Sequence, residues 1–591
     1  MNNDLSNVTM NLVETLEEAQ EFLNWLQQRR PLIAIDTEST GLSWWETRFV
    51  RLIQFGDELG GWALSADGWG AVIEQACKYV ANAGIPVAMQ NAKFDMHAME
   101  CMGWTTPAWA SIIDTKILDH LCYPIRSHGL KQMGKRRFGE AAVVGDRMLK
   151  HFMNQHNLTW DTIPVDTEVY WAYGVMDTVL TARFAMELGA EVRERGMLPA
   201  FERESAIQAI AFRMEKRGLN IDLPYTQRLK DEWRDEMCSL KIQLDEWGVA
   251  NPNSKAEVLK ALKVREGWDP EAFTMTGEPK LDKNVLEGMD SRIAPLVIRY
   301  KRLVKWTGSY LNHFLDESVD GVVFPSINTM AARTGRMSVS NPGLQTLPSK
   351  EGSIRKCIVP DEGKVLHAVD YEAMELRVMA SMSNDPGLLQ VFREGLDPHS
   401  YVASVVYGLP YEELVAGQHK AQRGTAKNTQ FARIYGAGAE TIASTAGVPV
   451  HQIEEFMNIY DLRFPGVSKF MKEVERDGNT RLQLEGQPYV TTQYGRWLNV
   501  EPDSIFKLVN YAIQGACADL FKDRQVLLDK MGYGDNLVMW IHDEALLQFD
   551  EGDEDSPREV ASIMEDHEMF NVPMTTSREG PFKSWGEPYG A

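Results

Sequence analysis

The segment "VMWIHDEALLQF", residues 538–549, is apolar along most of its length, yet it carries two adjacent carboxylates, Asp543 and Glu544. The apolar run predicts a buried strand that the two acids interrupt. An unpaired buried carboxylate is destabilising unless it takes up a proton, and the segment contains no Lys or Arg. We therefore expect the compensating positive charge to come from outside the segment.

The same pattern occurs twice more in the chain. In "PLIAIDTEST" (31–40) an apolar run leads into Asp36 and Glu38, and in "KVLHAVDYEAMELR" (364–377) another leads into Asp370. An Asp after a strand is most often a helix N-cap or a turn residue. Three such segments in one chain favour a shared function for the carboxylates.

The composition is that of a globular protein with more than one domain. The chain has 591 residues, of which 44% are hydrophobic and 25% charged, and single cores stop growing at roughly 250–300 residues. No apolar run is long enough to span a membrane, and the acidic N-terminus argues against a signal or transit peptide. The six cysteines form no CxxC pair, which argues against a zinc site or a disulfide framework. We expect a cytosolic protein without a membrane partner.

Basic residues gather in a few segments of this acidic chain. The formal net charge of −23 by itself argues against a nucleic-acid partner. Residues 295–313, 321–350 and 419–433 nevertheless contain basic residues and no acid, while acids concentrate elsewhere, as in residues 550–559. A charge run is usually a solvated face, but this segregation predicts a surface for a polyanion.

The order of apolar patterns indicates at least two domains. Residues 1 to about 190 alternate strand-like runs with helical segments, which predicts an α/β domain. A largely helical pattern follows to about residue 315, and a second helical stretch from about 385 to 480 separates the two later carboxylate strands. We expect a domain boundary near residues 195–200.

Four acids and a tyrosine in the first domain form a candidate metal site. Asp36 and Glu38 are two residues apart on a predicted strand and project from one face. Asp95 follows a later strand, and Tyr173 and Asp177 lie on one side of a predicted helix. Such carboxylates can hold two divalent ions roughly 3.5–4 Å apart for phosphodiester hydrolysis. Tyr173 is placed to orient the attacking water.

The motifs "DTESTGL", "NAKFD" and "YGVMD" contain these residues in this order. Together they resemble the DEDD exonucleases of the tyrosine subtype, the proofreading type. The resemblance covers about residues 30–190 and implies an α/β exonuclease domain with an RNase H-like fold. Asp114 also fits an acidic position of that family, and we expect its role to be structural.

Asp370 and Asp543 form a second candidate site, because both end apolar strands and can pair across a sheet to hold another pair of metal ions. Between them in the sequence, two basic and then two aromatic side chains recur every four residues: Arg423, Lys427, Phe431 and Tyr435. On a helix this spacing gives one slowly spiralling stripe. Such a stripe is usually core packing with surface charge, but two cations followed by two aromatics predict a nucleotide site.

Segments from about residue 325 to 550 resemble the family A DNA polymerases. In family order they are "TGRMSVSNPGLQTLP", "DYEAMELR", "RGTAKNTQFARIYG", "YVTTQYGRW", "NYAIQGACADLFK" and "IHDEAL". The resemblance implies a right-hand polymerase domain with an α+β palm and helical fingers and thumb. It implies template-directed addition of dNTPs to a primer 3′ end, with 3′-5′ exonucleolytic proofreading.

We expect the exonuclease domain at residues 1–195 and the polymerase domain at 196–591. Within the polymerase domain the expected parts are a thumb at about 200–320, a palm at about 321–385 and 485–591, and fingers at about 386–484.

The resemblance also implies roles for single residues. Asp370 and Asp543 are implied as metal ligands, and Lys427 as the donor of a proton to the leaving pyrophosphate. The implied nucleotide-binding residues are Arg423, Lys427, Phe431, Tyr435, Glu375 and His399, with Glu375 excluding a 2′-hydroxyl. The implied DNA-binding residues are Arg336, Gln345, Arg377, Asn510, Gln514 and His542. The exonuclease set is Asp36, Glu38, Asp95, Tyr173 and Asp177, of which the four acids bind metal.

Four positions depart from the family pattern. Gly343 and Thr346 stand where side-chain contacts to DNA are usual, Arg433 replaces a small residue, and Phe506 replaces an Arg. We therefore expect fidelity to differ from that of relatives. The length before Arg336 leaves room for a helical thumb without a large insertion for a processivity factor, and no 5′-nuclease domain is expected, which indicates a compact phage-type enzyme.

The expected cofactor is Mg²⁺, with two ions in each active site and Mn²⁺ as a substitute. The expected partners are primer-template DNA and dNTPs, with replisome proteins left unidentified. The expected location is the cytoplasm of a bacterial or phage-infected host cell.

Two other functions fit part of the sequence. A single-subunit RNA polymerase shares the Arg-xxx-Lys helix and the two-Asp palm, although Glu375, Glu544 and a proofreading domain argue against it. An exonuclease whose C-terminal part only binds DNA would leave Asp370, Lys427 and Asp543 without a role.

Overall fold

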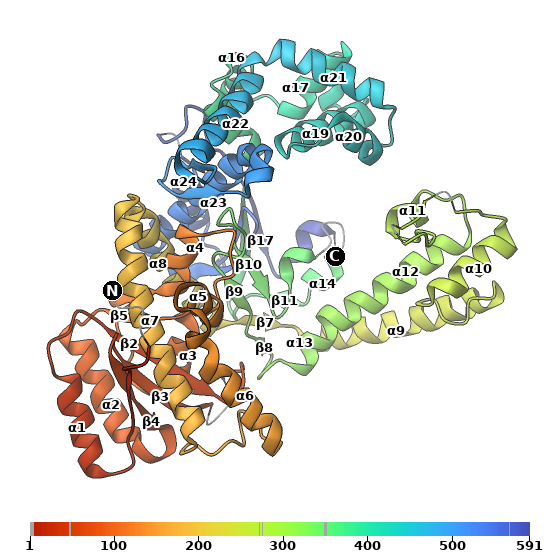
Figure 1. Ribbon diagram of the computed structural model, residues 1–591. Helices are drawn as coiled ribbons and strands as arrows, with labels where there is room; N and C mark the ends of the chain where they lie inside the picture. The colour runs from red at the N-terminus through yellow and green to blue at the C-terminus, as the bar shows by residue number, and fades with distance from the viewer. Residues whose placement is uncertain are drawn as a thin grey trace.

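The structure is a computed structural model that describes residues 5–45, 49–270, 272–274, 276–347, 352–566 and 568–590. The last three residues of the basic segment 321–350 lie outside these ranges. Figure 1 shows an N-terminal domain in red and orange, an arm of yellow-green helices, and a cyan group of helices, all joined at a central sheet. The two helical groups extend from that sheet in different directions.

The N-terminal domain is an α/β unit around a six-stranded mixed sheet. Its strands are β1 (Thr9–Leu12), β2 (Ile33–Ser39), β3 (Val50–Gly56), β4 (Gly60–Ser65), β5 (Val87–Met89) and β6 (Ile112–Asp114), in the spatial order β1-β4-β3-β2-β5-β6. β2 is antiparallel to β3 and parallel to β5. Ile33, Ala34 and Ile35 are fully buried, so packing on both faces fixes β2 up to its first acid, Asp36.

Helices cover this sheet, and two of them begin at a side-chain cap. They are α1 (Leu16–Leu26), α2 (Ala66–Ala83), α3 (Lys93–Cys101), α4 (Thr115–Cys122), α5 (Leu130–Phe138), α6 (Val144–His156) and α7 (Glu168–Glu194). Thr15 forms a capping box with Glu18 at α1, and the Asp114 carboxylate caps α4. α7 packs along β2, β3 and β4, so its polar residues meet the acids of β2.

The thumb is a long pair of helices with a small group at its tip (Figure 1). Its elements are α9 (Leu223–Glu246), α10 (Lys255–Glu266), α11 (Lys283–Glu287), α12 (Ile293–Trp306) and α13 (Asn312–Asp316). The preceding helix α8 (Leu198–Arg217) packs instead against α3, α4 and the palm helix α23 (Leu508–Lys530). α9 and α12 pack together, and Trp233 and Trp306 meet between them with ring centroids 5.7 Å apart. The helical region that the sequence predicted is present, interrupted by β7 (Leu219–Ile221).

The palm holds a four-stranded antiparallel sheet with the order β15-β16-β12-β17. These strands are β12 (Lys364–Tyr371), β15 (Leu537–Ile541), β16 (Glu544–Asp550) and β17 (Thr576–Phe582). The single strand predicted for residues 538–549 is wrong, because the chain reverses at His542 and Asp543 to form a hairpin. His542 has φ +60°, the left-handed conformation that a tight turn requires, and an apolar run cannot reveal such a turn.

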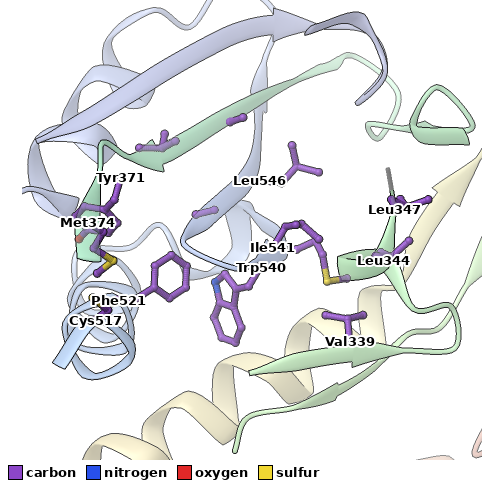
Figure 2. Close-up of a cluster of buried hydrophobic side chains, with 14 of the residues drawn as sticks. Val339, Leu344, Leu347, Tyr371, Met374, Cys517, Phe521, Trp540, Ile541 and Leu546 are labelled. Atoms are coloured by element: carbon purple, nitrogen blue, oxygen red, sulfur yellow. The ribbon is translucent and has the colours of Figure 1, made fainter. Parts of the chain in front are cut away.

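A shared hydrophobic core supports the palm sheet. Figure 2 shows Tyr371 of β12, Trp540 of β15 and Phe521 of α23 (Leu508–Lys530) pointing into one cluster. Tyr371 and Phe521 meet edge to face with centroids 6.4 Å apart, and the Trp540 indole donates to Gln525 Oε1 at 2.9 Å. Close packing of these rings fixes the strands that carry the carboxylates.

The helical stretch that the sequence predicted for about residues 385–480 is present in the fingers as a series of helices. They are α16 (Pro386–Arg393), α17 (Pro398–Tyr407), α18 (Tyr411–Val415), α19 (Lys420–Ile434), α20 (Ala439–Ala446), α21 (Val450–Arg463) and α22 (Pro465–Glu485). Gly408 and Gly447 end two of them in the left-handed conformation. None of the described helices is long and apolar enough to cross a membrane.

The remaining elements connect these parts. They are β8 (Val322–Val323), β9 (Ser326–Asn328), β10 (Ser338–Ser340), α14 (Gly352–Arg355), β11 (Ile358–Val359), α15 (Met374–Ser383), β13 (Tyr489–Thr491), β14 (Trp497–Asn499) and α24 (Asp555–Met564). β7 forms a three-stranded sheet with β11 and β8, which fixes the base of the thumb to the palm.

A buried ion network joins α8 to α23 beneath the palm. Its members are Arg203, Glu204, Arg496, Asp519 and Lys522, which are 9% exposed or less. Arg203 and Arg496 both donate to Asp519, at 2.6 and 2.8 Å, and Lys522 donates to Glu204 at 2.7 and 2.8 Å. Arg496 also pairs with Glu204. The network holds two segments together that are some three hundred residues apart in sequence.

Candidate functional sites

Three carboxylates converge in the N-terminal domain. Asp36 and Glu38 project from β2, and Asp177 reaches them from α7. One oxygen of each side chain lies within 4.8 Å of an oxygen of the other two. This spacing suits a shared divalent cation, because anionic oxygens so close together need positive charge between them.

Asp95, in the first turn of α3, is not one of the three acids that converge, but its charge acts on Asp36 and Glu38. The Thr37 hydroxyl donates to Asp95 Oδ1 at 2.7 Å, and Thr37 lies between Asp36 and Glu38, so the bond ties α3 to β2. Burial raises the pKa of Asp95 to about 7. Burial, followed by the charges of Asp95 and Glu38, raises the pKa of Asp36. A divalent cation would displace the protons that this group otherwise retains.

Tyr173 lies one helical turn before Asp177 on α7. Burial, followed by the charge of Asp177, raises the pKa of its phenol, so the hydroxyl stays protonated and can donate a hydrogen bond. Asp114 has a different role, because its carboxylate accepts from the backbone N–H groups of Asn91 and Ala92 at 3.1 and 2.9 Å. These bonds shape the turn before α3, which agrees with the structural role expected.

Lys131 also belongs to this group, and sequence reasoning missed it. Its ammonium group forms an ion pair with Asp177 and lies 3.8 Å from the centroid of the Tyr173 ring. The side chain is 19% exposed. The segment "SHGLKQMGKRRFG" (127–139) contains several basic residues without a distinguishing spacing, so only the fold shows which of them faces the acids.

The second group of acids lies in the palm. β12 pairs with β16 so that Asp370 faces Glu544, and Asp543 directly precedes Glu544 in the hairpin turn. Burial, followed by the charges of Asp543 and Glu544, raises the pKa of Asp370 to about 7. Burial also raises the pKa values of Asp543 and Glu544. None of the three forms a salt bridge with a Lys or Arg among the described residues, so their charge is available to a cation.

The predicted stripe lies on α19 and ends at its C-cap, Tyr435. Arg423 donates two hydrogen bonds to the Asp397 carboxylate, both of 3.0 Å. Lys427 is exposed and makes no salt bridge with any residue that the structure describes. One cation of the stripe is therefore held by an acid, whereas the other is available to a ligand.

His399 of α17 packs beside this stripe. Its ring lies 5.7 Å from that of Phe431, measured between centroids, and its Nδ1 is 3.4 Å from the Gln430 side-chain nitrogen. Burial lowers the pKa of His399 to about 4. The imidazole is therefore neutral at pH 7 and can meet a phosphate as a hydrogen-bond donor and without a full positive charge.

Glu375 of α15 is the centre of a polar chain between palm and fingers. Its carboxylate forms an ion pair with Arg336 and accepts from the Tyr435 hydroxyl at 3.4 Å. The Gln514 amide donates to the same hydroxyl at 2.9 Å. Four residues for which the sequence implied separate roles thus form one connected group.

Arg377 is placed differently from a residue that contacts DNA. Its guanidinium donates to the backbone carbonyl oxygens of Glu372 at 2.7 Å and Pro573 at 2.6 Å. It is 8% exposed and lies 4.8 Å from the centroid of the Phe392 ring. In this structure Arg377 therefore braces α15 against the C-terminal segment.

The other predicted DNA contacts lie at the palm surface or just below it. Gln345 accepts from the Val339 N–H at 3.2 Å and donates to the Met337 carbonyl at 3.1 Å, so its amide supports β10. His542 is exposed in the hairpin turn, and Asn510 is half-buried near the start of α23.

Two protein-family comparisons cover most of the chain. Residues 10–193 match the family described as 3′-5′ exonuclease, and residues 224–587 match the family described as DNA polymerase family A. The chain belongs to DNA polymerase family A. The expected fold class and the expected activities, DNA-directed DNA polymerase and 3′-5′ exonuclease, are confirmed.

Relatives of this polymerase occur in phages and bacteria. The DNA polymerase of Mycobacterium phage D29 is 29% identical over 607 residues, which cover 99% of this chain and 98% of that one. DNA polymerase I of Pseudomonas aeruginosa is 27% identical and matches 88% of this chain but 56% of its own length. The solved polymerase domain of M. smegmatis Pol1, in complex with DNA primer-template and dNTP, has a TM-score of 0.78 at 22% identity and covers 98% of this chain and 99% of that one. That likeness concerns the fold.

Enzymes of both families depend on metal ions, and the polymerase has a carboxylate cluster suited to one in its exonuclease domain. The acidic groups of the two domains are separate and come from different sheets.

The acid-free segments of the polymerase are partly neutralised by acids from elsewhere in the chain. Arg299 pairs with Glu236 through two bonds of 2.7 and 2.9 Å, and Arg333 pairs with Glu501 at 2.7 Å. Local sequence cannot show these pairs because the partners are distant. The cations of these segments that make no salt bridge with a described residue include Lys301, Lys305, Lys420 and Lys427.

Two of the departures from the family pattern have local partners. Arg433 forms an ion pair with Asp461 and a hydrogen bond to Ser468 at 3.3 Å, so the fingers compensate its charge. Phe506 is 47% exposed and lies against Gly436 after the stripe. Both departures therefore alter the surroundings of α19.

Proposed function

We propose that the polymerase site is formed by Asp370 and Asp543, which hold two Mg²⁺ ions, with primer-template DNA and dNTPs as its substrates. The observation that carries this proposal is the β12–β16 register, which brings two carboxylate strands together although no described Lys or Arg forms a salt bridge with their acids. Hard oxygen ligands of this kind suit Mg²⁺, and Mn²⁺ accepts the same set. When bound by these carboxylates, such ions would supply charge stabilisation to the attacking 3′-oxygen and the leaving phosphate.

The residues of the fingers act on the triphosphate. Lys427, exposed and without an acidic partner, contacts the phosphates and donates a proton to the leaving pyrophosphate. Arg423 also contacts the phosphates when its guanidinium exchanges the Asp397 carboxylate for a phosphate group. A guanidinium binds both anions through the same pair of parallel N–H donors. His399 adds a neutral hydrogen-bond donor. Phe431 and Tyr435 flank the sugar and base.

Glu375 selects the sugar. The ion pair with Arg336 and the bond from Tyr435 fix its carboxylate in one position, and a fixed side chain excludes a 2′-hydroxyl more effectively than a mobile one. Arg336, Gln345, Asn510, Gln514 and His542 complete the contacts with primer and template, mainly through the backbone and minor groove.

The exonuclease site uses Asp36, Glu38, Asp95 and Asp177 to hold two further Mg²⁺ ions. Bound there, divalent ions would supply Lewis-acid activation of a water and charge stabilisation of the leaving oxygen. The neutral phenol of Tyr173 orients the water, because its raised pKa keeps the hydroxyl protonated. The site removes a nucleotide from an unpaired primer 3′ end.

The proposed boundaries are residues 1–195 for the exonuclease domain and 196–591 for the polymerase domain, with the thumb, palm and fingers as expected from the sequence. The proposed location is the cytoplasm of a bacterial or phage-infected host cell. No replisome partner is proposed.

Separation of the two activities tests these assignments. Asp36→Ala with Glu38→Ala should abolish excision and leave dNTP incorporation, whereas Asp543→Ala should do the reverse, because the two sets of acids lie in different domains. The measurement is extension and degradation of a labelled primer in the presence of Mg²⁺, with dNTPs and NTPs compared. Loss of both activities from either change, in a protein with an unchanged circular dichroism spectrum, would contradict the two-site assignment.

A further inference from the structure

Lys131 brings a positive charge into the exonuclease carboxylates. It is the second residue of α5, and its ammonium forms an ion pair with Asp177. Asp177 is 8% exposed and Lys131 19% exposed at the side chain, so water screens this pair poorly. The ammonium also lies 3.8 Å from the centroid of the Tyr173 ring, a cation–π contact that holds it in place.

Asp177 therefore has two possible cationic partners. One is Lys131, which is part of the chain, and the other is the divalent ion proposed for the same carboxylate. An ammonium is a compact, strongly hydrated cation that binds carboxylate oxygens as a small metal ion does. A cation that occupies an oxygen of Asp177 must give it up before a metal ion can use it, which lowers the apparent affinity for the metal.

The polymerase site lacks such a group. Asp370, Asp543 and Glu544 form no salt bridge with a described Lys or Arg. Among the described residues, an ammonium group thus pairs with a carboxylate of the exonuclease site, whereas no Lys or Arg forms such a pair with the three palm acids.

We propose that Lys131 is an internal competitor for the divalent ion of the exonuclease site, so that excision requires a higher free metal concentration than synthesis does. This inference rests on the proposed metal-binding role of Asp177. Without metal, Lys131 holds the carboxylates together; when metal binds Asp177, the ammonium leaves that oxygen while its tether keeps it near the site. Free Mg²⁺ concentration then sets the balance between proofreading and extension.

The chain offers a matched control on the same helix. Lys135 is 61% exposed at the side chain and pairs with Glu140 at 2.8 Å, away from the acids of β2 and α7. Lys131→Met removes the charge and keeps most of the side-chain length, and Lys135→Met makes the same chemical change where no metal is expected. Lys131→Gln serves as a second neutral variant if Lys131→Met does not fold.

The first measurement is the affinity of the protein for Mn²⁺, determined by isothermal titration calorimetry. All variants carry Asp370→Asn and Asp543→Asn, so that the titration reports the exonuclease site. Lys131→Met should bind Mn²⁺ at least fivefold more tightly than Lys135→Met, and its melting temperature in EDTA should be lower than that of the control. Equal Mn²⁺ affinity in the two variants would overturn the inference.

The second measurement separates this inference from the proposed function. In the otherwise unchanged protein, the Mg²⁺ concentration that gives half-maximal excision of a single-stranded oligonucleotide should fall at least threefold with Lys131→Met, while that for primer extension stays constant. Intact excision with an unshifted Mg²⁺ dependence would overturn the role of Lys131 alone. A wild-type protein without excision at any Mg²⁺ or Mn²⁺ concentration would overturn the exonuclease assignment itself.

Discussion

The steric gate proposed for Glu375 requires a carboxylate that is held still, and two contacts hold it. The ion pair with Arg336 and the hydrogen bond from Tyr435 at 3.4 Å come from different parts of the palm and fingers. We expect Glu375→Ala to raise incorporation of ribonucleotides relative to deoxyribonucleotides by tenfold or more, which is about 1.4 kcal/mol of lost discrimination. The measurement is competitive incorporation of an NTP and its dNTP opposite one template base.

Tyr435→Phe provides the control for this prediction. It removes one of the two contacts to Glu375 while the carboxylate remains, so the selectivity should fall by less than with Glu375→Ala. A ratio that is unchanged in Glu375→Ala would place the sugar gate elsewhere.

His399 should make the polymerase sensitive to acid. Its folded pKa of about 4 lies below the ordinary value of about 6.5, so the unfolded chain takes up a proton first as the pH falls. The free energy of unfolding therefore falls as the pH drops from about 6.5 to about 4. At pH 5 the loss is about 2 kcal/mol relative to neutral pH. We expect His399→Asn to weaken the pH dependence of the urea midpoint between pH 7 and pH 5.

His451→Asn is the matched control, because His451 is exposed on α21. The wild-type protein and His451→Asn should show the same dependence on pH. A His399→Asn curve parallel to theirs would show that His399 titrates alike in the folded and unfolded chain.

At the scale of elements, the turn before Arg336 depends on one glycine. Gly335 has φ +82°, and an added Cβ would lie 2.9 Å from Cζ of Arg496, whose guanidinium is fixed in the buried ion network. Gly335→Ala would therefore combine a strained backbone with a clash against a group that cannot move away. We expect a loss of about 2–4 kcal/mol in the free energy of unfolding, measured from the urea midpoint.

Gly363→Ala separates the two causes. Gly363 has φ +78° and nothing within 4 Å of an added Cβ, so this change should cost only the backbone strain of about 1–2 kcal/mol. Equal losses in both variants would show that the contact with Arg496 is unimportant.

The elements also show where sequence reasoning succeeds and fails. The apolar runs before Asp36 and Asp370 marked β2 and β12 correctly, because buried strands need continuous apolar residues. The same rule predicted a single strand for residues 538–549, where the structure has β15 and β16. An apolar run does not reveal that the chain reverses at His542. Asp36, Glu38 and Asp177 meet as the motifs implied, whereas the position of Lys131 and the pair of Arg423 with Asp397 depend on how distant helices pack.

The whole molecule has a net charge of −23, yet some cations of its acid-free segments make no salt bridge with a described residue and are available to DNA. We expect primer-template affinity to fall at least tenfold between 50 and 200 mM salt, since each neutralised phosphate contributes about −0.9 to the logarithmic slope. Lys305→Ala should reduce this slope by about one. The measurement is Kd by fluorescence anisotropy across a salt series.

Arg299→Ala is the comparison on the same helix, because Arg299 is paired with Glu236 and releases fewer counterions. It should change the slope less than Lys305→Ala does. A slope near zero in the wild-type protein would mean that the basic segments face solvent.

The buried ion network restricts how sequences of this kind can diverge. Loss of one acid, Glu204 or Asp519, leaves buried cations uncompensated, which costs roughly 3–5 kcal/mol, whereas exchange of a whole ion cluster for apolar residues of similar volume can be neutral. The charged and the apolar versions are thus separated by intermediates that are less stable than either. Descendants should inherit the five positions as a block, and selection should remove partial exchanges before any difference in catalysis is exposed to it.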